Sequence, residues 1–245
     1  MIAEICCGSL KDVIISEKVG ADRVELNSSL SLGGLTPSMG LLVSCLERTS
    51  IPIVTMVRPR GGGFSYNRYE LDNMMEDINL LVKYPIKGIA LGILKDDKTF
   101  NIEYMKKIID KLKTYEKEVI VHRAFDNVLN PREEIEKLIK LEVDRILTGG
   151  LNSKALEGVD ILKDLQDEYK DEIEILAGGG VNYQNVEEIY KNSGITQFHS
   201  SCRVWREDIT SQGNISYNYS GIKGCDYEEV DEVLARKFVE EIKKL

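Results

Sequence analysis

Residues able to transfer protons follow one apolar stretch, Val119 to Asp126, which reads VIVHRAFD. A short β-branched run of this kind is typical of a buried parallel strand, and here it ends in an imidazole, a guanidinium and a carboxylate. His122 is one of two histidines in the chain, and the other, His199, closes a similar run, ITQFHSS. If both strands belong to one closed sheet, both imidazoles face one site. We therefore expect a site that includes His122, Arg123, Asp126 and His199.

Charged side chains also interrupt other apolar runs, where side chains alternate between the two faces with period two. On that parity one face carries Glu4, Cys6, Arg23, Glu25, Asn27, Met56, Arg58, His122, Asp126 and His199. Buried charges must be paired, so two interpretations are open. Glu4, Arg23, Glu25 and Arg58 form an ion-pair network that fills the barrel, or these side chains do chemistry. In the second case Glu4, Glu25 or His122 is a general acid or base, and Arg58 binds an oxygen group of the substrate.

A glycine-rich loop follows the seventh apolar run and precedes a helical pattern. Consecutive glycines, Gly178, Gly179 and Gly180, let backbone N–H groups approach an anion, and the loops after strands seven and eight bind phosphate in many barrels. Ser200 and Arg203, after the eighth run, could complete such a cradle. We predict an anion site there, with Arg123 and His199 nearby; a plain glycine turn is the alternative.

One sulfur pair is suited to a soft metal. Cys6 and Cys7 are neighbours in a strand and point to opposite faces, so they cannot readily bind one ion together. Cys6 and Met56 could do so if both face the interior, because cuprous ion accepts thiolates and thioethers. The chain has five cysteines without CxxC spacing, which favours reduced thiols over a disulfide framework.

These residues require a scaffold of repeated strand–helix units. Eight short apolar runs alternate with amphipathic stretches: Ile2–Cys6, Arg23–Asn27, Ile53–Val57, Ile89–Leu91, Val119–His122, Arg145–Thr148, Ile173–Ala177 and Gln197–Ser200. Such alternation predicts a parallel sheet with right-handed crossovers. No G-x-G-x-x-G follows the first run, which argues against an open dinucleotide-binding sheet. We predict one α/β domain over residues 1–245, a (β/α)8 TIM barrel. An irregular loop over 203–224 should precede a last helix within DYEEVDEVLARKFVEEIKKL.

The net charge and the lack of long apolar runs limit the classes of partner that this protein can bind. The formal net charge of −9 argues against nucleic acid or an anionic membrane surface, since both require a basic face. The first residues lack the basic and apolar regions of a signal peptide, and no run of eighteen apolar residues occurs. We expect a cytoplasmic protein whose partners are small molecules or proteins.

Several long motifs together resemble the CutC family, described as copper homeostasis proteins. They are EICCGSLKD, GADRVELNSSLSLGGLTPSMGLL, MVRPRGGGFSYN, HRAFD, RILTGG, AGGGV and FHSSCR, and they span nearly the whole chain. The resemblance implies a (β/α)8 barrel, a cytoplasmic location, self-association with a dimer favoured, and copper binding or trafficking. The family commonly has ELC in the second strand and FHASAR in the eighth. Here Asn27 replaces the cysteine and Cys202 stands in FHSSCR.

Three hypotheses for function follow. The first is copper handling, with cuprous ion bound through Cys6, Met56 or Cys202. The second is an enzyme that performs acid–base chemistry on a small phosphorylated or otherwise anionic metabolite. The third is a sensor that binds such a metabolite without converting it. Thiol-dependent copper uptake would support the first, and a bound anion at Gly178 to Gly180 the second or third.

Overall fold

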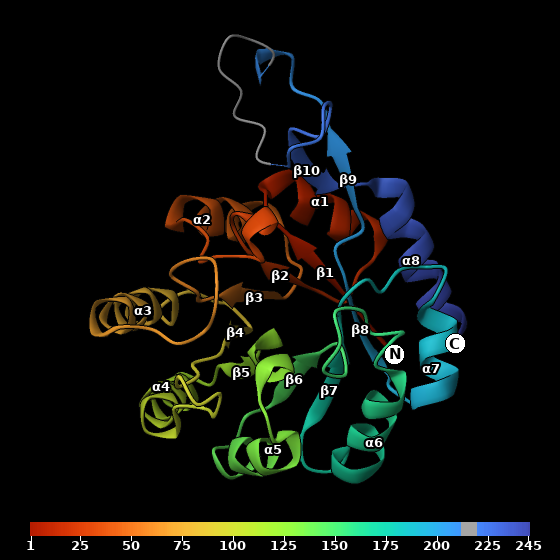
Figure 1. The fold of residues 1–245 in the computed structure, drawn as a ribbon. Helices are drawn as coiled ribbons and strands as arrows, with labels where there is room; N and C mark the ends of the chain where they lie inside the picture. The colour runs from red at the N-terminus through yellow and green to blue at the C-terminus, as the bar shows by residue number, and fades with distance from the viewer. Residues whose placement is uncertain (212–219) are drawn as a thin grey trace.

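Eight parallel strands close into a barrel surrounded by helices in the computed structural model, which describes residues 1–211 and 220–245 (Figure 1). The strands neighbour one another in chain order, so the predicted (β/α)8 TIM barrel is confirmed. They are β1 (Ile2–Cys7), β2 (Arg23–Leu26), β3 (Ile53–Met56), β4 (Gly88–Leu91), β5 (Glu118–Val121), β6 (Arg145–Thr148), β7 (Glu174–Ala177) and β8 (Gln197–Ser200). The helices are α1 (Leu10–Val19), α2 (Met39–Arg48), α3 (Arg68–Leu81), α4 (Ile102–Thr114), α5 (Pro131–Lys140), α6 (Val159–Tyr169), α7 (Val186–Ser193) and α8 (Glu232–Lys244).

Local sequence explains where several helices begin. The side chains of Ser9, Ser38 and Asp231 accept hydrogen bonds from the first turns of α1, α2 and α8, and Asn67 forms a capping box with Glu70 in α3. In α5 Pro131 occupies the first turn and the Asn130 side chain makes no capping hydrogen bond, so the proline marks where this helix begins.

The period-two alternation of the strands divides the apolar core in two. One set of side chains packs between the strands and the helices, and a smaller set fills the barrel interior: Val54, Met56, Ala90, Ile120, Leu147 and Leu176. The interior set lies on β3 to β7, and the neighbouring strands β8, β1 and β2 contribute the polar and charged side chains Gln197, His199, Glu4, Arg23 and Glu25. The lumen is therefore packed with side chains and does not form a pore.

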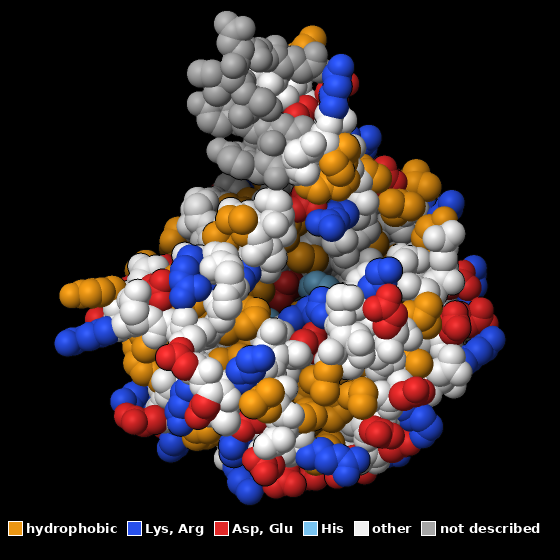
Figure 2. All heavy atoms as spheres, in the orientation of Figure 1, with side chains coloured by type: hydrophobic (Ala, Val, Ile, Leu, Met, Phe, Trp, Pro, Cys, Tyr) orange, Lys and Arg blue, Asp and Glu red, His pale blue; other side chains and the backbone are white. Residues whose placement is uncertain are grey.

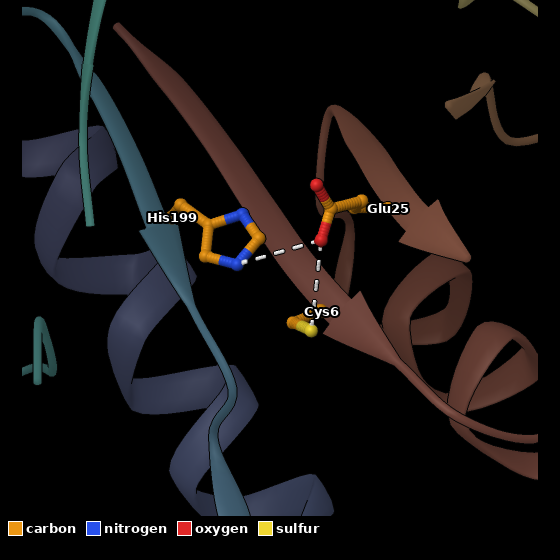
Figure 3. A group of neighbouring side chains, drawn as sticks. All are labelled: Cys6, Glu25 and His199. Carbon is orange, nitrogen blue, oxygen red and sulfur yellow. Dashed lines mark hydrogen bonds and ion pairs between the residues drawn. The ribbon is translucent and has the colours of Figure 1, made fainter. Parts of the chain in front are cut away.

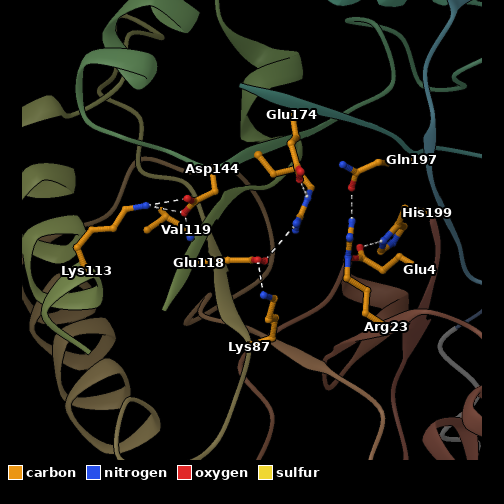
Figure 4. A network of polar contacts seen from close by, with 11 residues as sticks. Glu4, Arg23, Lys87, Lys113, Glu118, Val119, Asp144, Glu174, Gln197 and His199 are labelled. Carbon is orange, nitrogen blue, oxygen red and sulfur yellow. Dashed lines mark hydrogen bonds and ion pairs between the residues drawn. The ribbon is translucent and has the colours of Figure 1, made fainter. Parts of the chain in front are cut away.

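Ion pairs occupy the end of the barrel where the strands begin. Arg145 donates to Glu118 and Glu174, and all three lie at the first positions of β6, β5 and β7 (Figure 4). Arg23, the first residue of β2, donates to Gln197, the first residue of β8. The Arg145 contacts join β6 to its neighbours β5 and β7, and the Arg23 contact joins β2 to β8, which is not its neighbour. Part of the charge seen in the sequence is therefore structural.

A small antiparallel sheet extends from the barrel beside α1 and α8 (Figure 1). Its strands are β9 (Arg203–Arg206) and β10 (Tyr227–Val230), within and just after the stretch predicted to be irregular. Cross-strand pairs of Arg203 with Glu228 and of Arg206 with Glu229 stabilise it. The residues of β10 were expected at the start of the last helix, but these pairs hold them extended and α8 begins only after Asp231. The stretch 212–219 lies outside the described residues.

Three short 3-10 helices complete the described structure: Leu30–Leu32, Arg123–Asn127 and Ile209–Ser211. Among the described residues, no helix has both the length and the hydropathy that crossing a membrane requires.

Candidate functional site

A cavity of about 250 Å³ opens at the end of the barrel where the strands finish. Residues from β1, β2, β3, β5, β6, β7 and β8 or the loops after them line it, together with Glu228 of β10. In Figure 2 histidine and acidic atoms lie in a hollow near the middle of this face, with Lys or Arg atoms at its edge. A larger depression of about 560 Å³ lies at the opposite end. Its residues include the Arg145, Glu118 and Glu174 ion pairs, so we assign it to structure and place the candidate site in the smaller cavity.

Three side chains of types that can bind a metal meet in this cavity. One donor atom each from Cys6, Glu25 and His199 lies within 4.8 Å of the other two. They come from β1, β2 and β8, which are neighbours in the sheet, and they point toward one another (Figure 3). Asn27 Nδ2 donates to Glu25 Oε2 at 2.9 Å and to Cys6 Sγ at 3.4 Å, which orients both groups.

Glu4 contacts His199, the histidine of this cluster, at the ring nitrogen Nδ1. Its carboxylate accepts a hydrogen bond from Arg23 and lies 2.7 Å from His199 Nδ1 (Figure 4). Burial alone raises the pKa of Glu4, but the hydrogen bond with His199 and the charge of Arg23 outweigh it and lower that pKa from 4.5 to about 2. Glu4 is thus ionised and contacts two cations.

Two other members of the cluster, Cys6 and His199, hold protons at neutral pH. Burial raises the pKa of the Cys6 thiol to about 12. Burial also raises the pKa of Glu25, and the Glu4 carboxylate adds to this effect. For His199 burial lowers the pKa, yet its contacts with Cys6, Glu4 and Glu25 raise it well above 6.5. The cluster is a thiol and an imidazolium beside two carboxylates of unequal acidity.

His122 and Arg58 form a separate part of the cavity wall. The ring of Phe64 lies 4.9 Å from the His122 ring and 5.0 Å from the Arg58 guanidinium carbon. Phe64 follows the Gly61–Gly63 turn and was not expected at the site. An aromatic residue directly after a glycine-rich turn, with Arg58 three positions before that turn, was the signal that could have identified it.

The predicted anion-binding residues are brought together only in part. Gly179, Gly180, Arg123, Ser200 and Arg203 line the cavity, as does His199. Gly178 lies outside the cavity. Its N–H donates a hydrogen bond to the Thr148 carbonyl, and a Cβ at this position would contact the Leu147 side chain. Both rim arginines already have carboxylate partners, Arg123 with Asp126 and Arg203 with Glu228.

Asp126 does not face the lumen, contrary to our expectation. It accepts hydrogen bonds from the Thr148 hydroxyl and from the N–H groups of Gly149 and Leu151. The 3-10 turn Arg123–Asn127 ends the strand periodicity and directs this carboxylate toward the loop after β6. Asp126 therefore joins two loops and lies outside the cavity.

Only two of the three predicted soft ligands lie together. Met56 lines the cavity with Cys6, but Cys202 packs in the outer core and its thiol contacts Ser200 Oγ at 3.4 Å. Cys202 has a left-handed backbone, with φ of 44°, which turns the chain away from the lumen after β8. Burial raises the pKa of its thiol to about 11. The structure instead brings Cys6 together with Glu25 and His199. We had expected these three side chains on one face of the sheet but had not predicted them as ligands of one ion.

This arrangement permits two kinds of chemistry. Sulfur, nitrogen and oxygen donors at these separations can surround one metal ion once the thiol and imidazolium lose their protons. The same carboxylates and imidazole can also move a proton to or from a bound molecule.

Known proteins resemble this chain over most of its length. The CutC family model matches residues 1–204. A Treponema denticola protein named as a CutC family protein is 39% identical over 218 residues, covering 89% of this chain and 88% of the relative. A human protein named copper homeostasis protein cutC homolog is 38% identical over 224 residues, covering 91% and 81%. The crystal structure of a putative copper homeostasis protein CutC from Streptococcus agalactiae superimposes with a TM-score of 0.77 at 31% identity, covering 82% of this chain and 98% of that one.

Proposed function

This chain belongs to the CutC family, and we propose that it binds a single copper ion, as cuprous ion, through Cys6 and His199 with Glu25 beside them. The observation that carries the proposal is the convergence of their donor atoms within 4.8 Å. Bonds of about 2.0 to 2.3 Å from a metal to nitrogen or sulfur allow two ligands on opposite sides of one ion to lie about 4.3 Å apart. Only small side-chain adjustments are needed for that geometry.

The donor chemistry fits copper better than a hard cation. A thiolate and an imidazole are ligands that copper accepts readily, whereas Mg²⁺ and Ca²⁺ select sites made of oxygen atoms alone. Met56 lines the same cavity and offers a thioether. Asn27 occupies the position where the family commonly has cysteine, so this chain supplies one thiolate where a second would be expected.

Copper uptake by the Cys6 thiol can be tested directly. The full-length protein is titrated anaerobically with cuprous ion against a chromogenic copper chelator, and stoichiometry is read by native mass spectrometry. We expect one copper per chain, lost in Cys6→Ser and weakened in His199→Gln. Cys202→Ser is the matched control and should retain copper, because that thiol packs outside the lumen. Retention in Cys6→Ser with loss in Cys202→Ser would refute the proposed site.

One observation favours the acid–base hypothesis as a second candidate. Glu4 and Glu25 contact the same imidazole, yet the pKa of Glu4 is lowered to about 2 while that of Glu25 is raised. Carboxylates whose pKa values are moved apart are typical of sites that use one as a proton carrier. Copper-free protein incubated with 2-oxobutanoate in D₂O provides a test. Exchange of the C3 hydrogens, seen by NMR and lost in Glu25→Gln, would support proton transfer; equal exchange in both proteins would count against it.

The cytoplasmic location and the self-association implied by the family resemblance remain predictions. A molar mass of one chain by light scattering across the micromolar range would contradict self-association.

A further inference from the structure

Apart from the Cys6, Glu25 and His199 cluster, the cavity wall contains a buried cation with no counter-ion among the described residues. Arg58 is 5% exposed, and its two terminal nitrogens donate to the backbone carbonyls of Leu32, Gly34 and Gly62 at 2.6 to 3.0 Å. Among the described residues no carboxylate lies within ion-pair distance, and Arg58 Nε has no hydrogen-bond partner. Carbonyl dipoles hold the guanidinium in place but leave its charge unbalanced, which is costly in a buried site.

The same wall carries a buried donor without an acceptor. His122 is 3% exposed, and its Nδ1 accepts a hydrogen bond from the Ala124 N–H at 3.1 Å. A neutral ring that accepts at Nδ1 carries its proton on Nε2. Burial, together with the charge of Arg58, lowers the pKa of His122 to about 3, so the ring is neutral at pH 7. Its Nε2–H has no partner in the described structure.

The remaining charges around the cavity balance within the protein. Arg203 pairs with Glu228 and Arg123 with Asp126, while the two cations Arg23 and His199 face the two carboxylates of Glu4 and Glu25. The excess charge of the wall is therefore the single positive charge of Arg58. One negative charge on a ligand would neutralise it, whereas a second would lie near Glu25 and Glu228.

The space between these groups is apolar. Leu30, Met56, Phe64, Leu147 and Val181 line the cavity, and its volume of about 250 Å³ accommodates one small organic molecule. Apolar atoms make up most of the cavity surface although many lining residues are polar, and a mostly apolar surface with polar groups at defined positions is usual for a small-molecule site.

We propose that this cavity binds a small organic monocarboxylate, with its carboxylate toward Arg58 and the Nε2–H of His122 and its apolar part against Phe64 and Leu147. The ligand satisfies both the unpaired charge and the unpaired donor, and it uses none of the proposed copper ligands. This site therefore goes beyond the proposed function and is independent of it.

Benzoate is the probe, and benzamide, which has the same shape without the charge, is its control. Calorimetric titration of the metal-free full-length protein should show benzoate binding at least about tenfold more tightly than benzamide, since a hydrogen bond to a charged group contributes roughly this factor. His122→Phe should weaken benzoate binding about tenfold, and His122→Gln, whose amide can donate, should retain most of it. Equal affinity for the two probes, or no saturable benzoate binding, would overturn the proposal.

A second measurement does not depend on how the variants fold. In the wild-type protein, the ¹⁵N and ¹H signals of His122 Nε2–H should shift on benzoate addition, and no shift despite saturable binding would overturn the proposed pose. The proposal is separable from copper binding: Cys6→Ser should bind benzoate normally, and His122→Phe should bind copper normally. Loss of benzoate binding in Cys6→Ser would contradict an independent site.

Discussion

His199 and Glu4 lie directly opposite each other on the neighbouring strands β8 and β1, with 2.7 Å between His199 Nδ1 and Glu4 Oε1. On its other side Glu4 is the register partner of Arg23 on β2. One carboxylate thus lies between two cations in a single row across three strands. This row sets the protonation of the histidine that reaches the base of the cavity.

Replacing that carboxylate should destabilise the barrel. Glu4→Gln leaves Arg23 and His199 buried without a carboxylate, and breaking a buried pair from one side typically costs about 3 to 5 kcal/mol. Urea unfolding at pH 7, followed by circular dichroism, measures the change in the free energy of unfolding. The double variant Glu4→Gln/Arg23→Met should recover part of the loss. An unchanged midpoint in Glu4→Gln would show that the row contributes little to stability.

The buried neutral His122 predicts sensitivity to acid. Its pKa is about 3 in the folded protein against 6.5 for the free side chain, so between these values the unfolded chain binds the extra proton and stability falls as pH decreases. With about 1.4 kcal/mol per pKa unit the full effect approaches about 5 kcal/mol. Unfolding free energies measured from pH 7 to pH 4 should fall less steeply in His122→Gln than in the wild type. Parallel curves for the two proteins would contradict a neutral His122.

Copper binding should strengthen as pH rises. The Cys6 thiol, with a pKa of about 12, and the His199 imidazolium, with a pKa well above 6.5, both hold protons at neutral pH. Because copper displaces both protons, the apparent affinity should increase by up to about a hundredfold per pH unit. Chelator competition between pH 6.5 and 8 measures this slope, and pH recording in weak buffer counts the protons released. An affinity independent of pH would argue against these two ligands.

A second thiolate beside Cys6 should tighten copper binding. Asn27 Nδ2 lies 3.4 Å from Cys6 Sγ, so Asn27→Cys places a sulfur within reach of the same ion. Soft ligands favour cuprous ion, and we expect an affinity increase of at least about tenfold. Asn27→Ser, which removes the amide without adding sulfur, is the control for the lost hydrogen bonds to Glu25 and Cys6. Equal affinities in the two variants would show that this position does not reach the metal.

Most of the scaffold and part of the site followed from the sequence alone. The apolar runs are short, β-branched and evenly spaced, and period-two alternation within them placed Glu4, Cys6, Glu25 and His199 on one face. All four do face the barrel interior, because backbone geometry fixes alternation inside a strand.

The predictions that differed concern residues beyond the strand ends. Asp126 follows a 3-10 turn and Cys202 has a left-handed backbone, so parity no longer determines where either side chain points. Phe64 reaches the cavity from a loop, and its position depends on contacts with Arg58 and His122 that the sequence does not reveal. The β9–β10 sheet likewise depends on pairs between residues more than twenty positions apart, such as Arg203 with Glu228.

Side chains packed in the barrel interior make the cavity a blind chamber. Val54, Ala90, Ile120 and Leu176 fill the interior on β3 to β7, buried Glu4 and Arg23 fill it on β1 and β2, and the ion pairs of Arg145 lie at the far end. Whatever enters at the mouth must leave by the same opening. If one partner delivers an ion there and another removes it, the two must dock in turn, and each excludes the other while it is bound.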